Sequence, residues 1–286
     1  MSRCKLKTKV SFILIFMLVA SLLFLPASLV SAAPKSNTTT SVSYVALGDS
    51  IATGTVTQFT TITSYVTYFY QHLQSYYGRR VTVKLTNLSH DGDRTNELLL
   101  KLQTDSTVRS AVTNANVITI SIGGNNLMQA ASIPGFTSID PAKLDQGLRD
   151  FNDQWPQIIN AIKALNRKNA KIIVATVYNP YDINEPVGYE ADQGLHELTD
   201  RYLIGSQPLD GQPSYNSIDN VINSNTALGY KVADTFTSFD AYSPSQMGQV
   251  TYMYPSLLNY IFRNPHPNST GQGIITGLHN KVFDSY

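Results

Sequence analysis

The sequence predicts an α/β domain: a three-layer sandwich with a central, mostly parallel five-stranded sheet and helices on both faces. Two observations support this fold class. Five short apolar runs rich in β-branched residues recur along the chain, and several are continuously apolar, which is typical of strands covered on both faces. Segments with helical spacing of apolar residues separate these runs, and such alternation predicts a parallel sheet.

The elements follow one another in a simple order. The predicted strands occupy residues 42–47, 81–88, 117–122, 171–177 and 230–235, and the predicted helices occupy residues 63–77, 96–103 and 144–166. The last of these helices shows the pattern well, because Leu148, Phe151 and Trp155 fall on one side of it. A final helix is expected after Asn268, where Asn268, Ser269 and Thr270 mark its start.

Two stretches fit this alternation poorly. Residues 180–217 are rich in Pro, Gly, Tyr and Asp, although 191–202 could be a helix, and residues 236–260 are rich in Ser, Tyr and Met. Long irregular insertions after strands of an α/β domain usually build the binding site or its lid. Surface decoration is the alternative interpretation, and the sequence does not choose between them.

The N-terminal residues have the pattern of a secretory signal. Four cations among residues 3–9 precede an almost wholly apolar run at 11–29, and Val30-Ser31-Ala32 offers the small residues that a signal peptidase reads. We therefore expect a signal peptide over 1–32, a disordered leader over 33–41 and one domain over 42–286, secreted and without a stable membrane span after cleavage. A retained membrane anchor is the alternative, because the apolar run is long enough to span a bilayer.

Charge and cysteine content narrow the function classes. Removing the signal leaves 17 Lys and Arg against 20 Asp and Glu, a formal charge of −3, and no block of like charge stands out. This balance argues against nucleic acid as a partner. The single cysteine, Cys4, precedes the apolar run, so the mature chain would have no disulfide and would depend on its core for stability. We find no metal-binding cluster and no nucleotide-binding glycine motif, and expect no cofactor.

Polar residues follow the predicted strands at the edge where ligands of an open parallel sheet bind. The first strand ends in Gly48-Asp49-Ser50, the second runs into Ser89-His90-Asp91-Gly92, and the third ends in Gly123-Gly124-Asn125-Asn126. Near the C-terminus comes Asn264-Pro265-His266-Pro267-Asn268. A serine needs a neutral imidazole to take its proton as it attacks a carbonyl. The resulting oxyanion needs fixed donors, which a glycine N–H and an asparagine amide supply without a competing charge.

In this order the four blocks resemble those of the SGNH (GDSL) hydrolase family. Ser50 in "GDSIATG", Gly92 in "NLSHDGDRTNELL", Asn125 in "SIGGNN" and His266 in "NPHPNSTGQG" match the four blocks, and the resemblance spans residues 42–280. It implies a flavodoxin-like fold, Ser50 as nucleophile, His266 as base, and an oxyanion hole from Ser50, Gly92 and Asn125. The Gly-x-Ser-x-Gly elbow of α/β-hydrolases is absent.

Each of these residues also has a plainer interpretation. Ser50 could merely cap the following helix, and Gly92 could be an ordinary turn glycine. Asn126 stands beside Asn125, where the family usually has Asp, but counting from Gly123 favours Asn125. Asp49 is expected to tie the turn together through its own hydrogen bonds rather than to act as a base.

Four other histidines compete with His266, namely His72, His90, His196 and His279. His72 lies on the apolar face of a predicted helix, where a core or interface role is expected. His90 is the main competitor, because it lies two residues before Gly92. The Pro-His-Pro setting just before a capped helix favours His266.

The chain departs from the family at the residue that should orient His266. The family usually places Asp three residues before the histidine, and here that position is Arg263. A cation there would disfavour the imidazolium, so we expect the Arg263 guanidinium to face away. A backbone carbonyl in the 263–264 segment is the favoured acceptor for the Nδ1 proton, with the side-chain oxygen of Asn264 as the alternative.

The sequence thus favours a secreted serine esterase or lipase that hydrolyses small-molecule, lipid or glycan esters through an acyl-enzyme on Ser50. There are two alternatives: an acyltransferase with the same residues, and a catalytically silent glycan- or lipid-binding protein. The acyl chain, the alcohol and the oligomeric state are not readable from the sequence.

Overall fold

The protein contains a five-stranded sheet in which every neighbouring pair of strands is parallel. In this computed structural model, residues 40–130, 139–181, 189–205, 215–242, 246–253 and 264–286 are described, all of them within one compact unit, Thr39–Tyr286. The strands are β1 (Thr40–Gly48), β4 (Val81–Asn87), β5 (Val117–Ser121), β6 (Lys171–Ala175) and β7 (Lys231–Ala233), and they lie in the order β4-β1-β5-β6-β7.

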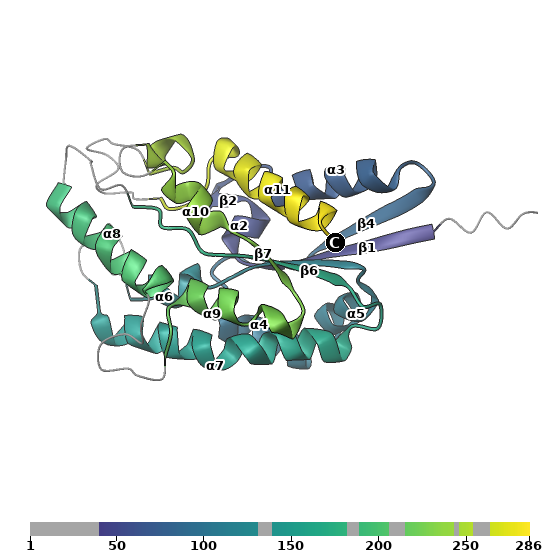
Figure 1. The fold of residues 1–286 in the computed structure, drawn as a ribbon, viewed down its shortest axis with the longest axis horizontal. Helices are drawn as coiled ribbons and strands as arrows, with labels where there is room; N and C mark the ends of the chain where they lie inside the picture. Colours follow the sequence, from purple (N-terminus) through teal and green to yellow (C-terminus); the bar gives the residue numbers. More distant parts are fainter. Residues whose placement is uncertain (1–39, 131–138, 182–188, 206–214, 243–245, 254–263) are drawn as a thin grey trace, which may run out of the picture. The chain divides into compact units, whose positions relative to one another are not determined.

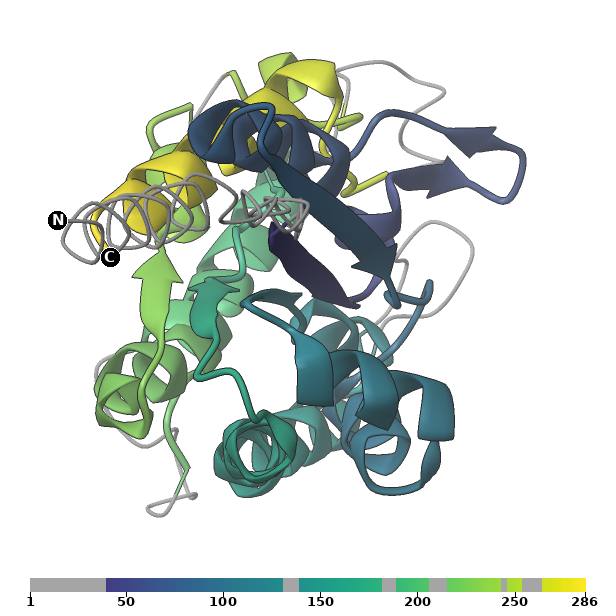
Figure 2. The same cartoon turned by 90° about the vertical axis from the view of Figure 1, so that its right-hand side faces the viewer.

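Helices cover both faces of this sheet (Figure 1). One face carries α3 (Tyr65–Tyr77), α10 (Thr235–Asp240) and α11 (Ser269–Asp284), and the other carries α4 (Thr95–Thr104), α5 (Ser106–Asn114), α7 (Pro141–Leu165) and α9 (Ile218–Ser224). Figure 2 shows the same layers end on, with α11 in yellow and α3 in dark blue above the sheet and α7 in teal below it. The predicted three-layer fold class is confirmed.

The strand order creates a switch point in the middle of the sheet. From β1 the chain crosses to β4 on one side, and it then returns to build β5, β6 and β7 on the other side of β1. Connections therefore leave β1 and β5 in opposite directions, and ligands of doubly wound sheets bind at this position, beyond the carboxyl ends of the strands. Ser50 follows β1 and Asn125 follows β5, so both lie at the switch point.

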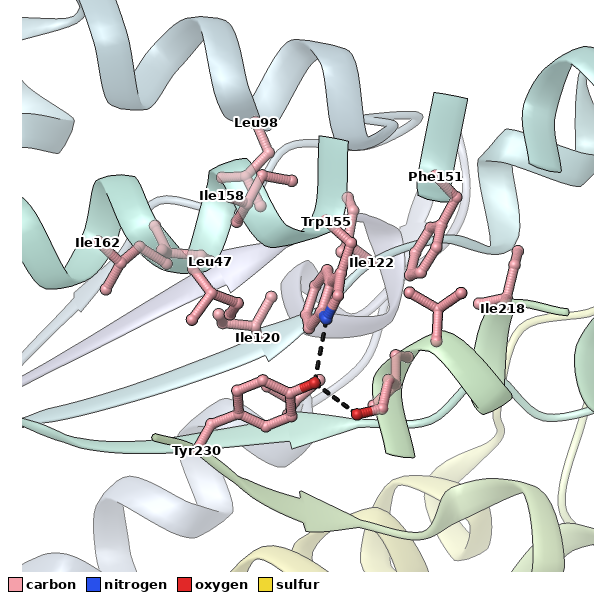
Figure 3. Close-up of a cluster of buried hydrophobic side chains, with 14 of the residues drawn as sticks. Leu47, Leu98, Ile120, Ile122, Phe151, Trp155, Ile158, Ile162, Ile218 and Tyr230 are labelled. Carbon is pink, nitrogen blue, oxygen red and sulfur yellow. Dashed lines mark hydrogen bonds between the residues drawn. The ribbon is translucent and has the colours of Figure 1, made fainter. Parts of the chain in front are cut away.

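Two buried clusters, one on each face, hold the layers together. Leu47 and Ile120 of the sheet pack against α4, α7 and α9 in one cluster, where Trp155 stacks on Phe151 and donates from Nε1 to the hydroxyl of Tyr230 at 3.1 Å (Figure 3). The other cluster joins the opposite face of the sheet to α3 and α11. Continuous burial on both faces explains the unbroken apolar runs of the strands.

The strands and long helices occur where the sequence predicts them, with small shifts at their ends. The expectation of a disordered leader over 33–41 is wrong at its end, because β1 begins at Thr40, where Thr40 and Ser41 pair with Val81 and Thr82 of β4. Backbone pairing needs no apolar side chain, so the hydrophobic pattern did not reveal these residues. The predicted signal peptide at 1–32 lies outside the described residues.

Several short elements accompany the sheet. They are α2 (Ser50–Thr53), the hairpin of β2 (Thr55–Thr57) and β3 (Thr60–Thr61), α6 (Gly124–Met128), α8 (Tyr189–Ile204), and the 3₁₀ turns η1 (Thr226–Leu228) and η2 (Met247–Gln249). The suggested helix at 191–202 is present as α8. No helix within the described ranges is long and apolar enough to cross a membrane.

Candidate active site

The turn between β1 and α2 places Ser50 at the end of the sheet. Gly48 comes so close to β5 that a Cβ there would lie 2.3 Å from the carbonyl oxygen of Ser121, so only glycine fits. Asp49 is the N-cap of α2, because its Oδ1 accepts from the N–H of Ile51 at 3.0 Å. Ser50 is therefore not the cap but the first residue of the helix, with a side chain that has another partner.

That partner is His266. Its Nε2 lies 2.8 Å from Ser50 Oγ, although the two residues are 216 positions apart in the chain. The other ring nitrogen, Nδ1, lies 2.6 Å from Oδ1 of Asn264. Because an amide oxygen only accepts, Nδ1 carries the proton and Nε2 is left free to accept the proton of Ser50.

Asn264 is itself held in this orientation. Its Nδ2 donates to the carbonyl of Val56 in β2 at 2.9 Å, and its Oδ1 also accepts from the backbone N–H of His266 at 3.0 Å. Both contacts require the oxygen to face the imidazole. The expectation that a backbone carbonyl orients His266 is therefore wrong in this structure, because the asparagine side chain occupies Nδ1. Arg263 lies outside the described residues.

Residues of the second insertion hold the histidine segment. The N–H of Tyr252 donates to the carbonyl of His266 at 2.9 Å, and Thr251 forms an antiparallel bridge with Pro267. Tyr178, which lies just before the first insertion, also contacts this segment: its hydroxyl donates to the carbonyl of Pro265 at 2.6 Å. The described part of 236–260 thus supports the site, which excludes mere surface decoration for these residues.

A buried glutamine, which sequence reasoning missed, links α11, the helix that follows His266, to α2, the helix that begins at Ser50. Gln272 in α11 accepts from the N–H of Tyr65 through Oε1 at 2.7 Å and donates from Nε2 to the carbonyl of Ile51 at 3.1 Å. It is fully buried, so both bonds are shielded from water. A glutamine in an amphipathic helix gives no sign of such a role in the sequence.

Three groups are candidates to stabilise an oxyanion at Ser50, namely the Asn125 amide and the backbone N–H groups of Ser50 and Gly92. Asn125 shares a cavity with Ser50 and His266. One of its Nδ2 protons is bound to the carbonyl of Asp93 at 3.1 Å, which fixes the amide and leaves the second proton available. Among the hydrogen bonds of the described residues, none uses the backbone N–H of Ser50 or of Gly92.

Gly92 is held beside the site by its two neighbours rather than by its own contacts. The carbonyl of Asp93 binds Asn125, and Oδ1 of Asp91 accepts from the hydroxyl of Thr53 in α2 at 2.6 Å. Gly92 has a φ of 78°, a left-handed conformation that favours glycine. Gly92 is not among the residues that line the cavity, so its donor role stays a prediction.

The adjacent asparagine has a different role. Asn126 is buried, and its side chain accepts from the N–H of Thr95 at 3.2 Å and donates to Thr95 Oγ1 at 2.8 Å and to the carbonyl of Gly147 at 3.3 Å. Its amide is saturated by α4 and α7, so it ties the end of β5 to those helices. The structure therefore places Asn125, not Asn126, at the cavity.

The competing histidines all have other partners. His72 binds Asp284 between α3 and the end of α11, and His90 is exposed and faces Asp93. His196 pairs with Asp200 in α8. His279 is buried, and its Nδ1 donates to the carbonyl of Ile275 in its own helix at 2.8 Å. None of the four lines the cavity that contains Ser50.

Burial shifts the two ionisable groups beside Ser50 in opposite senses. Loss of solvation lowers the pKa of His266, with a smaller opposing effect from the negative charge of Asp91. The imidazole is therefore neutral at neutral pH, as a general base requires. Burial raises the pKa of Asp49 to about 7, against the lowering effect of its bond with the N–H of Ile51.

The cavity beside Ser50 has a volume of about 210 Å³. Its reacting end holds Ser50, Asn125 and His266. The walls beyond come from α6, α7, α8 and the 175–181 segment and are largely apolar. Pro180 and Tyr181 from the first insertion also line it, as does Tyr202 of α8. Across the described ranges, no group of three or more His, Cys, Asp or Glu side chains is placed to hold a metal ion.

Comparison with known proteins shows the family to which this chain belongs. The chain belongs to the GDSL-like lipase/acylhydrolase family, whose model matches residues 46–204. Among curated proteins, the uncharacterized protein YpmR of Bacillus subtilis is 28% identical over 116 residues, which cover 39% of this chain and 44% of YpmR. The chain therefore matches less than half of that relative's length.

Solved structures show the same fold at low sequence identity. An extracellular lipase from Streptomyces rimosus is similar with a TM-score of 0.56 and 18% identity, over 84% of this chain and 99% of the lipase. An acetyl xylan esterase from Geobacillus stearothermophilus has a TM-score of 0.51 and 14% identity, over 84% and 94% of the two chains. These likenesses establish the fold, and the family model establishes membership of the GDSL-like lipase/acylhydrolase family.

Proposed function

We propose that this protein is an exported serine hydrolase that cleaves carboxylic esters through an acyl-enzyme on Ser50. One observation carries the proposal: His266 Nε2 lies 2.8 Å from Ser50 Oγ while its Nδ1 is occupied by Asn264. This is the geometry in which a neutral imidazole takes a serine proton.

The chemistry follows from these contacts. Ser50 Oγ attacks the ester carbonyl as its proton passes to His266 Nε2. The oxyanion accepts hydrogen bonds from Asn125 Nδ2 and from the backbone N–H groups of Ser50 and Gly92. His266 then returns the proton to the departing alcohol, and the acyl group remains on Ser50. Water attacks this second ester with His266 again as base, which releases the carboxylic acid and restores Ser50.

Export is supported by the N-terminal sequence. The cationic start, the apolar run at 11–29 and Val30-Ser31-Ala32 form a signal pattern. Protein recovered from the medium of a bacterial host that expresses the full chain should begin at Ala33 when its N-terminus is sequenced. Recovery only from the membrane fraction with residues 1–32 intact would favour the retained anchor instead.

Ser50→Ala tests the chemistry. A fluorophosphonate probe should label the wild type once, at Ser50, and the variant should show neither labelling nor hydrolysis of a chromogenic ester, a loss of at least about 10⁴-fold. Its melting temperature should hardly change, since Ser50 is not the helix cap. Ser106→Ala, an exposed serine at the start of another helix, is the matched control and should keep full activity. Hydrolysis that persists in Ser50→Ala would exclude Ser50 as nucleophile.

A further inference from the structure

The cavity beside Ser50 continues past the reacting groups into an apolar space with fixed walls. Leu127 and Met128 of α6, Leu144 of α7, and Leu198 and Leu203 of α8 supply most of this lining. Asp49 and His266 are the only Asp, Glu, Lys, Arg or His side chains among the described lining residues, and both lie at the reacting end. A charged acyl group would therefore find no partner of opposite sign in the deeper part.

Four of the hydroxyl groups that line this space, those of Thr176, Tyr178, Tyr202 and Thr235, are already bound by the protein. Tyr178 donates to Pro265, and Tyr202 donates to Oδ1 of Asp145 in α7 at 2.7 Å. Thr235 donates to the carbonyl of Thr176, whose own hydroxyl accepts from the N–H of Phe236. A sugar ring needs several free donors and acceptors, because its hydroxyls lose their water on burial. These walls therefore suit a hydrocarbon chain better than a sugar ring.

The wall formed by α8 is fixed at two points. The bond between Tyr202 and Asp145 joins α8 to α7. Asn179 donates to Asp200 Oδ1 at 2.7 Å, and His196 Nδ1 lies 2.8 Å from the carbonyl of Tyr181, so α8 is also joined to the 175–181 segment. Because these bonds already hold the wall in place, little conformational entropy is lost when a ligand enters, and this favours binding.

On this basis we propose that the cavity is a binding site for the acyl part of the substrate and takes a neutral hydrocarbon chain of about six to ten carbons. The size follows from its volume of about 210 Å³, because an apolar cavity of roughly 150 Å³ accommodates the six carbons of benzene. The inference rests on the proposed function, since the acyl carbonyl must lie at Ser50.

A series of p-nitrophenyl esters from acetyl to palmitoyl tests the site. Each buried methylene contributes up to roughly fourfold in binding, so kcat/KM for the octanoyl ester should exceed that for the acetyl ester by at least about 100-fold. Beyond about ten carbons the rise should stop. Equal or faster turnover of the acetyl ester, or of an acetylated xylo-oligosaccharide, overturns the proposal.

Leu198→Trp should fill the cavity and shift this profile. The variant should lose at least about tenfold in kcat/KM for the octanoyl ester while the acetyl ester changes by less than about twofold. Ile204→Trp is the matched control, because Ile204 is on the same helix but is exposed and does not line the cavity. It should leave the profile unchanged. An unchanged profile in Leu198→Trp, or an equal shift in both variants, overturns the assignment of this wall.

The two proposals fail in different ways. A flat profile whose turnover is still abolished by Ser50→Ala refutes the acyl site and leaves the serine mechanism intact. If no ester is hydrolysed, the serine mechanism fails, and n-octanamide binding to the Ser50→Ala protein by calorimetry decides the site separately. Binding that is weakened at least about tenfold by adding Leu198→Trp supports the site, and absence of binding overturns it.

Discussion

Two sets of side chains at the edge of the sheet, which we call layers, differ in how many of their hydrogen-bonding groups remain free. The cavity-facing layer comprises Ser50, Asn125 and His266, and the anchoring layer comprises Asp49, Asn126 and Asn264. Members of the two layers are one or two residues apart in the sequence. The first layer lines the cavity with side-chain groups that remain available, whereas each side chain of the second is bound to backbone groups, although Asp49 also lines the cavity and Asn264 also contacts His266.

The difference is clearest in the two asparagines after β5. Asn125 has one Nδ2 proton bound to Asp93 and the other available, whereas the amide of Asn126 is bound by Thr95 and Gly147 on both its oxygen and its nitrogen. A donor that acts on a developing charge must be fixed and yet unsaturated. The carbonyl of Asp93 fixes the Asn125 amide, whereas Asn126 holds the end of β5 to α4 and α7, so the effects of the two asparagines on catalysis and on stability can be tested separately.

Of the substitutions that distinguish the two layers, Asn125→Ala should have the largest effect on kcat. Asn125→Ala should lower kcat by about 10²–10³ with a smaller change in KM, because the donor acts mainly on the oxyanion. Asn126→Ala should instead lower the free energy of unfolding by about 1–3 kcal/mol, since it leaves buried partners unsatisfied, and should spare kcat in the folded fraction. Steady-state kinetics and urea unfolding of both variants measure this contrast, and a reversed pattern would move the oxyanion donor to Asn126.

Among the residues of the anchoring layer, Asn264 is the one whose replacement should lower the catalytic rate. Asn264→Ala removes the acceptor from Nδ1 of His266, so the imidazole can adopt the tautomer that cannot take the serine proton. In a serine protease the wrong tautomer costs about 10⁴ in kcat, and here, where no wrong partner is imposed, we expect a loss of about 10². A loss below about tenfold would show that another acceptor orients His266. Thermal melting separates this effect from loss of the link to Val56.

Much of this division was predictable from the sequence. Strand periodicity and glycine-containing turns placed Ser50, Gly92 and Asn125 at strand ends, and the fold class followed from the same pattern. The partner of His266 did not follow. A side-chain oxygen and a backbone carbonyl of the same segment are equally available in sequence, and the choice depends on Val56, 208 residues away, which fixes the Asn264 amide.

The walls of the cavity were also beyond sequence reasoning. The 180–217 stretch has few regular patterns, and its contribution depends on tertiary bonds such as that between Tyr202 and Asp145. Gln272 is a further case, because its role exists only where α11 meets α2 and α3. The roles of residues within a single local turn could be predicted from the sequence, whereas the roles of residues that connect distant elements could not.

The pH dependence of activity sharpens the role of Asn264. Burial lowers the pKa of His266, so the base stays neutral below the ordinary histidine value of about 6.5, and kcat/KM should fall only at more acidic pH. Asn264→Asp puts a carboxylate against the ring, which favours the imidazolium and raises the pKa. The acid limb should therefore move to higher pH in this variant. A profile that is identical in both proteins would mean that residue 264 does not contact the ring in solution.

The smallest effect on activity is expected at Asp49, although it is adjacent to Ser50, the proposed nucleophile. Asn also caps helices, so Asp49→Asn should keep the bond to the N–H of Ile51 and change kcat by less than about tenfold. The stability effect has a definite sign. The raised pKa of about 7 means that the folded protein holds a proton that the unfolded chain releases near pH 4.

The contribution of Asp49 to wild-type stability therefore decreases as pH rises from about 4 to 7 and levels off above that, by a few kcal/mol for a shift of this size. Asp49→Asn lacks this titration, so its stability relative to the wild type should increase over the same range and be greatest above pH 7. Urea unfolding of both proteins at pH 5, 6, 7 and 8 measures the difference. A thousandfold loss of kcat in this variant would instead give the Asp49 charge a part in catalysis.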